Sequence, residues 1–313
     1  MKRAFNVDTS ELVSFRTGGI ARELAVAETR QELLDVLSEA DSSDRPFVFL
    51  GNGTNTLFTD DFYDGTVIML GEAFERVDIN PDAGGALVTC GAACLLSGAA
   101  KAAAANSLTG LEFAAGIPGS AGGGVFMNAG AYGGEIKDVL QAVELVTGPD
   151  PAAEPGASGG GERRLVTIPA SELELGYRTS RLASTREIIV SAVFYLRDGV
   201  QKDIDGKIRE LAVRRQEKQP LDKPSAGSFF KRPPGDYAGR LIEAAGLRGL
   251  TVGGAQVSEK HCGFVINRGT ATARDIVDLM HIVQNTVFDK FGVHLEPEIR
   301  MISNEYTSGS AET

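Results

Sequence analysis

Two glycine-rich segments have the residues to hold a phosphate-bearing ligand. The first is Gly51-Asn-Gly-Thr-Asn55, which follows a short apolar run, where main-chain N–H groups can turn inward and bind an anion. It differs from the dinucleotide-binding fingerprint because residue 56 is threonine and not a third glycine, and from a P-loop because the Gly-Lys-Ser/Thr ending is absent. A plain turn at the end of a strand is the alternative interpretation, and this segment alone leaves both open.

The second segment spans residues 116–134 and contains eight glycines in nineteen residues. Each glycine loses more backbone entropy on folding than alanine would, by roughly 0.5–1 kcal/mol, so a purely structural loop has little reason to keep so many. Close approach of the backbone to a bulky ligand explains them better. We therefore predict that the two segments together hold a phosphate-bearing cofactor.

The composition favours a small ligand over a macromolecular one. The chain has 313 residues, with 31 Lys and Arg against 42 Asp and Glu, and its formal net charge of −11 argues against binding to nucleic acid or to an anionic membrane. No apolar run is long enough for a membrane span or a secretory signal, so we expect a cytoplasmic protein. The cysteines (Cys90, Cys94 and Cys262) and the three histidines lack metal-ligand spacing, which predicts buried free thiols and no metal.

Apolar periodicity predicts an α+β protein. Helices are expected over residues 30–40, 94–106, 203–216 and 273–291, and strands over residues 46–50, 66–70, 86–89, 139–146, 165–168 and 187–196. Thr29 followed by Glu32 indicates a capping box at the start of the first helix.

The pattern divides the chain into three predicted units, residues 1–70, 71–200 and 201–313. Residues 148–164 contain Pro, Gly, Ala and Ser but no large apolar residue, so they cannot offset their own ordering entropy. We expect a flexible surface insertion inside the second unit. A linker between two domains is the alternative.

Seven motifs, taken together, resemble one enzyme family, UDP-N-acetylenolpyruvoylglucosamine reductase (UDP-N-acetylmuramate dehydrogenase). They occur in the order of that family and cover nearly the whole chain. The motifs are SFRTGG (14–19), LGNGTNTLF (50–58), GLEFAAGIPGSAGGGVFMNAGAYGGEIKDV (110–139), GYRTS (176–180), PSAGSFFKRP (224–233), GGAQVSEKHCGFVIN (253–267) and LEPEIR (295–300).

The resemblance implies a two-subdomain FAD-binding fold of the vanillyl-alcohol oxidase (PCMH) type, followed by a C-terminal α+β substrate-binding domain. It implies noncovalent FAD, with NADPH as reductant and enolpyruvyl-UDP-N-acetylglucosamine as the substrate that becomes UDP-N-acetylmuramate for the bacterial cell wall. The residues expected to contact FAD are Gly51, Asn52, Gly53, Thr54, Asn55, Gly116, Ile117, Pro118, Gly119, Ser120, Gly123, Asn128 and Gly130. Covalent attachment is not expected because neither glycine segment contains histidine or cysteine.

Motif by motif, the family's catalytic arginine corresponds to Arg178, its proton-donating serine to Ser228 and its glutamate to Glu298. An arginine fork suits the negative charge that develops on the substrate, and a glutamate beside that charge should have a raised pKa. Read alone, the three residues could equally be a surface ion pair, a turn hydroxyl and an exposed carboxylate. Only their shared motif context favours catalysis.

The predicted substrate contacts are Tyr177, Lys218, Lys231 and Arg232. Residues 213–232 contain six cationic and two acidic side chains, a local excess of four positive charges in an acidic chain, which favours a polyanionic substrate over a solvated helix end. Lys231 is three residues from Ser228 and is a candidate for stabilising the serine alkoxide or returning its proton. Substrate and NADPH both carry phosphates and are expected to compete for this surface.

Two features distinguish the chain from the longer branch of the family. Only 50 residues separate Arg178 from Ser228, where the longer branch carries a tyrosine loop over the substrate, so the chain resembles the shorter branch. Arg232 also stands in the place of an asparagine. The remaining alternatives are a flavin oxidase of the same fold acting on an alcohol or hydroxy acid, and a catalytically silent nucleotide-binding regulator, although the intact catalytic motifs argue against both.

Overall fold

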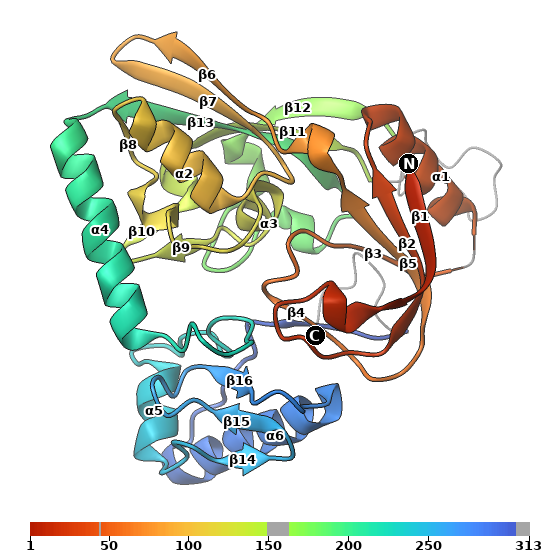
Figure 1. Ribbon diagram of the computed structural model, residues 1–313, viewed down its shortest axis with the longest axis vertical. Helices are drawn as coiled ribbons and strands as arrows, with labels where there is room; N and C mark the ends of the chain where they lie inside the picture. Colours follow the sequence, from red (N-terminus) through yellow and green to blue (C-terminus); the bar gives the residue numbers. More distant parts are fainter. Residues whose placement is uncertain (44, 149–162, 305–313) are drawn as a thin grey trace.

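The computed structural model describes residues 1–43, 45–148 and 163–304. Figure 1 shows two sheet-containing units, drawn in red to orange and in orange to green, with a blue C-terminal unit packed below them and joined to them by the long helix α4. In the described part of the chain, no helix is long and apolar enough to cross a membrane.

The first unit is a four-stranded sheet in the order β1-β2-β5-β3. Strand β1 (Lys2–Asp8) pairs antiparallel with β2 (Ile20–Ala27), whereas β5 (Tyr63–Leu70) runs parallel both to β2 and to β3 (Phe47–Phe49). Because β3 ends directly before the first glycine segment, this sheet fixes where that segment lies.

Helix α1 (Arg30–Ser42) covers one face of this sheet and buries Leu33, Val36 and Leu37. The hydroxyl of Thr29 accepts a hydrogen bond from the Glu32 N–H at 3.2 Å, as the capping box predicts. The Glu32 carboxylate, however, accepts from the N–H of Glu28 and not from that of Thr29.

The second unit is a six-stranded sheet built around β13 (Ile188–Asp198), with the order β12-β11-β13-β7-β6 and with β8 also paired to β13. Every pairing in this sheet is antiparallel. The remaining strands are β6 (Val77–Asp82), β7 (Gly85–Gly91), β8 (Leu108–Thr109), β11 (Leu140–Val146) and β12 (Leu165–Pro169).

Two helices and a small hairpin of the second unit carry the second glycine segment. Helix α2 (Leu96–Ala105) packs near the short helix α3 (Ala121–Phe126), which Ser120 caps by accepting from the Gly123 N–H. Strands β9 (Gly130–Ala131) and β10 (Gly134–Glu135) form the hairpin. The sequence patterns did not predict α3, because three of its six residues are glycine.

The C-terminal unit follows helix α4 (Gln201–Lys218) and combines a three-stranded sheet with two helices. Its last strand leaves this unit: β17 (Arg300–Ile302) pairs parallel with β4 (Thr56–Phe58), directly after the first glycine segment. The other elements are α5 (Ala238–Ala244), β14 (Thr251–Val252), β15 (Ala255–Val257), β16 (Val265–Asn267) and α6 (Ala273–Phe291).

The described residues form three apolar cores, two of which connect different units. The largest joins N-terminal residues such as Phe15 and Phe58 to Phe229 and Leu241 of the C-terminal unit, so the end of the chain is built into the first unit. A second core lies under α2 and the six-stranded sheet. The third joins α1 and the first sheet to Val146 and to Ile188 and Val190 of the second sheet.

The expected helices and strands are all present, with ends that differ by a few residues. The three cysteines are free and buried, as predicted. Most of the expected insertion, residues 149–162, lies outside the described residues. Near the end of the expected insertion, Arg163 is not exposed as we expected. It is 8% exposed, because its guanidinium is hydrogen bonded to Asp41 and to the Thr147 carbonyl.

Candidate active site

A cavity of about 270 Å³ lies between the first and second units, and we call it the glycine-loop cavity. Strands β3 and β5 line one side, and α3 with the start of β13 lines the other. Both glycine segments contribute: Gly51–Asn55 from the first, and Ile117, Gly119, Ser120 and Gly122–Gly124 from the second. The cavity therefore combines segments that are more than sixty residues apart in the sequence.

The two segments touch each other at the cavity wall. The side-chain amide of Asn52 donates to the Pro118 carbonyl at 2.7 Å. A β-carbon at Gly51 would come within 2.6 Å of the Ser120 hydroxyl oxygen, which is closer than real side chains approach. Glycine at position 51 is therefore what allows Ser120 and the first segment to meet.

The main chain of both segments presents hydrogen-bond donors that the protein does not use. Among the described residues, none accepts a hydrogen bond from the N–H groups of Gly51–Asn55, or from those of Gly119 and Ser120. Backbone donors beside a cavity are normally paired, and a run of them suits an anion such as a diphosphate. The site thus fits a phosphate-bearing cofactor.

Several glycines of the second segment are explained by protein packing and not by a ligand. A β-carbon at Gly122 would come within 2.9 Å of Ala92, one at Gly124 within 2.6 Å of Leu96, and one at Gly134 within 2.6 Å of Phe113. The expectation that these glycines all serve close approach to a ligand needs this correction. Gly119, on the cavity wall, has room for a β-carbon, whereas one at Gly123 would lie 3.3 Å from the Ser120 hydroxyl oxygen.

Nine of the thirteen predicted cofactor contacts line the cavity, and four do not: Gly116, Pro118, Asn128 and Gly130. Gly116 faces the guanidinium of Arg215, and Pro118 presents its carbonyl to Asn52. The Gly130 carbonyl accepts from Nη2 of Arg178 at 3.0 Å. Gly116, Pro118 and Gly130 therefore contact other protein residues outside the cavity wall or at its edge.

Asn128 has a different role from the predicted cofactor contact. It is fully buried, and its amide donates to the Gly176 carbonyl at 2.8 Å and to the Glu135 carboxylate at 3.0 Å, while its oxygen accepts from the Lys137 N–H. A side chain with all these protein partners cannot also contact a ligand. It instead holds the turn that begins at Gly176 and carries Arg178.

Arg178 and Glu298 form a direct ion pair, with Nε and Oε1 2.8 Å apart and with side chains that are 15% and 11% exposed. Arg178 lies in the left-handed backbone region at φ 56°, in the tight turn where Gly176 and Thr179 pair. Its guanidinium also lies 5.1 Å from the centre of the Tyr177 ring. The sequence motifs predicted both residues, and the structure brings them together from positions 120 residues apart.

Burial raises the pKa of Glu298, and the nearby cations Arg178, Lys231 and Arg232 only partly oppose this effect. The raised pKa was predicted. A carboxyl group with this property can take up a proton under conditions where an exposed glutamate cannot.

The main chain of Glu298 connects two parts of the site. Its carbonyl accepts from the Asn55 side-chain amide at 2.9 Å, and Asn55 lines the glycine-loop cavity. Its N–H donates to the Phe229 carbonyl at 2.9 Å, beside Ser228. The three predicted catalytic residues are thus held together around Glu298.

Ser228 opens into a second hollow, which we call the cationic pocket. Ser228, Phe230 and Arg232 line this pocket. Lys231 is not among its lining residues and forms an ion pair with Glu296.

The cationic pocket has five positive side chains and one carboxylate, Glu243, in its wall. Predicted Lys218 and Arg232 are joined by cations that the sequence patterns did not indicate, from α5 and the following segments: Arg240, Arg248 and Lys260. Tyr177, the fourth predicted substrate contact, lies at the rim, where its hydroxyl accepts from the Arg232 N–H at 3.1 Å. Such a pocket favours a ligand with several negative charges.

Comparison with known proteins identifies the parts of this site. Residues 21–151, which include both glycine segments, match an FAD binding domain. Residues 219–302, which include Ser228 and Glu298, match the C-terminal domain of UDP-N-acetylenolpyruvoylglucosamine reductase.

Relatives with the same name cover nearly the full length. The chain is 42% identical to UDP-N-acetylenolpyruvoylglucosamine reductase of Clostridium botulinum (strain Eklund 17B / Type B) over 96% of this chain and 93% of that protein, and 44% identical to the protein of the same name in Lachnoclostridium phytofermentans, with equal coverage. The chain belongs to the UDP-N-acetylenolpyruvoylglucosamine reductase family. The crystal structure of this reductase from Thermus caldophilus is similar over 96% of this chain and 98% of that one, with a TM-score of 0.76 and 34% identity.

Membership of the reductase family confirms the predicted fold, the FAD cofactor and the oxidoreductase class. It favours the reductase over the oxidase and the silent regulator. Within the glycine-loop cavity of this reductase, two cations were missed by sequence reasoning, Arg186 and Arg300. The motif LEPEIR contains Arg300, but only the parallel pairing of β17 with β4 shows that this residue reaches the cavity.

Proposed function

We propose that this reductase uses NADPH to reduce enolpyruvyl-UDP-N-acetylglucosamine to UDP-N-acetylmuramate, with Arg178, Ser228 and Glu298 as its catalytic residues. The observation that supports this assignment is the position of Glu298, which is paired to Arg178 and hydrogen bonded through its main chain to both Asn55 and Phe229. It thereby lies between the glycine-loop cavity and the cationic pocket, where cofactor and substrate would meet.

The glycine-loop cavity has the chemistry to hold FAD. The unpaired N–H groups of Gly51–Asn55 and of Gly119 and Ser120 would receive the diphosphate, and the Arg300 side chain, which lies 4.5 Å from the Phe126 ring centre, adds a positive charge from the C-terminal unit. FAD held by these residues would supply the redox chemistry, that is, hydride transfer from NADPH to C3 of the enolpyruvyl group. All other steps are assigned to side chains.

Arg178 would stabilise the negative charge that develops at C2 and its carboxylate as the hydride arrives at C3. Its guanidinium is held on two sides, by Glu298 through Nε and by the Gly130 carbonyl through Nη2. A fixed cation with little solvent around it stabilises a developing anion without having to reorganise. The left-handed backbone at Arg178 is part of what aims this fork.

Ser228 would then donate its hydroxyl proton to C2, which completes the addition of one hydride and one proton across the double bond. Among the described residues, none forms a hydrogen bond with the Ser228 hydroxyl, so it is free to turn toward a substrate in the cationic pocket. Lys231 is paired with Glu296 and does not line the cationic pocket, which argues against the role that its spacing suggested. Glu298, which has a raised pKa, is hydrogen bonded through its main chain to Phe229, the residue after Ser228.

The cationic pocket would hold the diphosphate of the nucleotide sugar and, in the other half of the reaction, the phosphates of NADPH. Lys218 and Arg232 are the predicted contacts, and Arg240, Arg248 and Lys260 extend the same positive surface. Because both ligands need this surface, each should inhibit competitively against the other. Both are metabolites of the cytoplasm, which is where we place the reaction.

Stopped-flow measurements on a Ser228→Ala variant test this assignment. Without oxygen, NADPH should bleach the flavin absorbance at the wild-type rate, whereas addition of the enolpyruvyl substrate should restore the absorbance at least about a hundredfold more slowly, as for loss of a general acid. Ser225→Ala makes the same change three residues away and should leave both rates unaltered. A normal rate of restoration in Ser228→Ala would overturn the role of this hydroxyl.

A further inference from the structure

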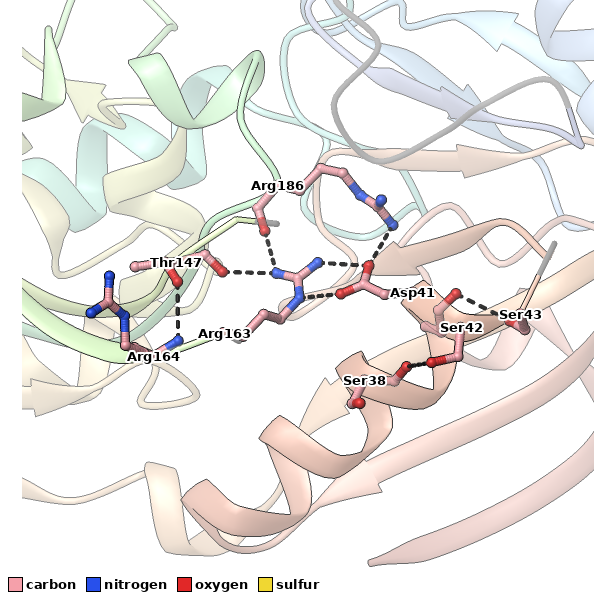
Figure 2. A network of polar contacts seen from close by, with 9 residues as sticks. Ser38, Asp41, Ser42, Ser43, Thr147, Arg163, Arg164 and Arg186 are labelled. Atoms are coloured by element: carbon pink, nitrogen blue, oxygen red, sulfur yellow. Dashed lines mark hydrogen bonds and ion pairs between the residues drawn. The ribbon is translucent and has the colours of Figure 1, made fainter. Parts of the chain in front are cut away.

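A polar network joins the first two units (Figure 2), and one of its members, Arg186, lines the glycine-loop cavity. Nε and Nη2 of Arg163 bind the two carboxylate oxygens of Asp41 at 2.5 and 3.0 Å, and its Nη1 donates to the carbonyls of Thr147 and Arg186 at 3.0 and 2.9 Å. Nη2 of Arg186 lies 3.1 Å from the same Asp41 carboxylate. One carboxylate thus holds two guanidinium groups.

The network connects elements that belong to different sheets. Asp41 lies in the last turn of α1, in the first unit, whereas Arg163 precedes β12 and Arg186 precedes β13, in the second. Both guanidinium groups also lie over the Phe47 ring, at 6.0 Å for Arg163 and 4.6 Å for Arg186. Bidentate arginine–carboxylate pairs fix geometry as well as contributing energy, so the network sets how far the two sheets stand apart here.

Its position along the cavity indicates which part of the cofactor lies beside it. Arg186 lines the cavity together with Thr185, Glu187 and Ile188. Arg186 lies over Phe47, the first residue of β3, whereas the glycine segment Gly51–Asn55 follows the end of that strand. Asn55, the last residue of this segment, is bonded to the catalytic Glu298. With the flavin ring at Glu298 and the diphosphate at the loops, the remaining end receives the adenosine half of FAD.

The chemistry of Arg186 suits a polar or aromatic ligand group. Arg163 is 5% exposed in its side chain and fully engaged, but Arg186 is 35% exposed and makes a single ion pair, so most of its N–H donors have no partner among the described residues. Burial lowers the pKa of Arg186, which shows that its charge is incompletely solvated. A guanidinium that lies 4.6 Å from the centre of the Phe47 ring can donate to ribose or adenine acceptors, and guanidinium groups also stack on bases.

We propose that Asp41 and Arg163 form a clamp that holds Arg186 against the adenosine half of FAD and so gives the protein its preference for the dinucleotide over the mononucleotide. In this proposal Arg186 contacts the cofactor, while Asp41 and Arg163 are positioning residues. The proposal rests on the placement of FAD given above. A simpler role, a staple that only joins two sheets, would affect all flavins alike.

The test compares the affinities of the apoprotein for FAD and for FMN, which lacks the adenosine half, from quenching of flavin fluorescence. Arg186→Met and Asp41→Asn should weaken FAD binding by about tenfold or more, as expected for loss of a charged hydrogen bond, and leave FMN binding unchanged. Asp35→Asn, on the same helix and bonded among the described residues to Gln31 alone, should change neither affinity.

Equal losses for FAD and FMN, or no loss for FAD, would overturn the clamp. If Asp41→Asn unfolds below the assay temperature, Arg186→Met decides, because it removes one ion pair and leaves Arg163 bound to Asp41. The placement of FAD is checked separately with Gly51→Ala, which should weaken both flavins. Wild-type affinity of that variant for both would show that the placement, and not the clamp, is wrong.

Discussion

The glycine-loop cavity and the cationic pocket recognise phosphate-bearing ligands in different ways. The cavity presents main-chain N–H groups, which are fixed by the fold and carry no net charge. The pocket presents five cationic side chains on flexible stems from α4, α5 and three loop segments. The first arrangement suits a cofactor that stays bound, and the second suits two ligands that must enter and leave in turn.

The two regions also differ in what a substitution can disturb. In the cavity, a methyl group added at Gly51, Gly53, Gly122 or Gly124 would come closer to another atom than real side chains do. In the pocket, each cation can be removed without creating a clash, and its neighbours partly compensate. Arg178 and Glu298 line neither the cavity nor the pocket. We call this ion pair, which lies between the two regions, the junction. Substitutions in the cavity, in the pocket and at the junction should therefore have different effects.

Arg178 should have the largest effect, because it belongs to the junction and acts on the reaction itself. Arg178→Ala is expected to slow reoxidation of the flavin by the substrate by roughly 10²–10³-fold, the usual effect of losing one preorganised donor. Arg178→Lys should be almost as slow, since one ammonium cannot bind both Glu298 and the Gly130 carbonyl as Nε and Nη2 do. Anaerobic single-turnover absorbance measures this rate.

The control for Arg178 is the other half of the reaction. Flavin reduction by NADPH and FAD affinity should stay within about twofold of the wild type, because neither depends on enolate stabilisation. If Arg178→Lys restores the flavin absorbance at the wild-type rate, the fork geometry has no catalytic importance and the junction is only structural.

Gly51→Ala tests the glycine-loop cavity. The added methyl group would lie 2.6 Å from the Ser120 hydroxyl, and overpacking of this kind destabilises by about 1–3 kcal/mol, so FAD affinity should fall by roughly 5- to 150-fold. Gly206→Ala is a matched control in α4, where a β-carbon meets nothing within 4 Å. That variant should unfold at a slightly higher temperature, by the helix propensity of alanine, and bind FAD normally. Unchanged FAD affinity in Gly51→Ala would break the contrast between the two regions.

Local sequence patterns predicted most of the secondary structure and the two segments of the glycine-loop cavity. The last long helix begins at the Thr272 cap and ends at Phe291 before Gly292, which lies in the left-handed region. The glycine motifs indicated the cavity because the glycines that line it are close together in the sequence, within residues 51–55 and 116–134. Motif context likewise predicted Arg178, Ser228 and Glu298 as catalytic residues, and the structure brings their segments close together.

Features that depend on distant contacts could not be predicted in this way. Arg163 lies in a segment whose composition indicates exposure, but Asp41, 122 residues earlier, accepts its hydrogen bonds and buries it. Asn128 sits among glycines and resembles a ligand contact, but its partners come from residues 135–176. The cationic pocket is assembled from separate segments whose individual charges look like ordinary surface.

Arg232→Ala and Lys218→Ala test the cationic pocket and should have smaller effects than substitutions in the glycine-loop cavity. Each is expected to raise KM for the nucleotide sugar by about tenfold, as for one charged hydrogen bond, with less change in kcat. The increase should shrink at high ionic strength, because salt already screens these charges in the wild type. Arg274→Ala removes a cation that is 85% exposed on α6 and should leave KM unchanged. An equal rise in that control would mean that net charge, and not the pocket, attracts the substrate.

The smallest effect concerns the pH dependence of stability and distinguishes Glu298 from the carboxylates outside the junction. Burial raises the pKa of Glu298, so the folded protein holds this proton more tightly than the unfolded chain. Its contribution to stability is therefore complete below the ordinary glutamate pKa and is lost as the pH rises through the raised value. Glu298→Gln should remove that decline from a plot of the free energy of unfolding against pH.

Glu135 provides the comparison, because its salt bridge with Lys137 lowers its pKa and reverses the sign. Glu135→Gln should remove a gain in stability with rising pH, in a lower pH range than the decline removed by Glu298→Gln. Denaturant unfolding of the apoprotein at a series of pH values measures both slopes without the contribution of bound FAD. If the Glu298→Gln and wild-type curves are parallel, the buried carboxyl titrates like an exposed one, and the junction is as open to water as the cationic pocket.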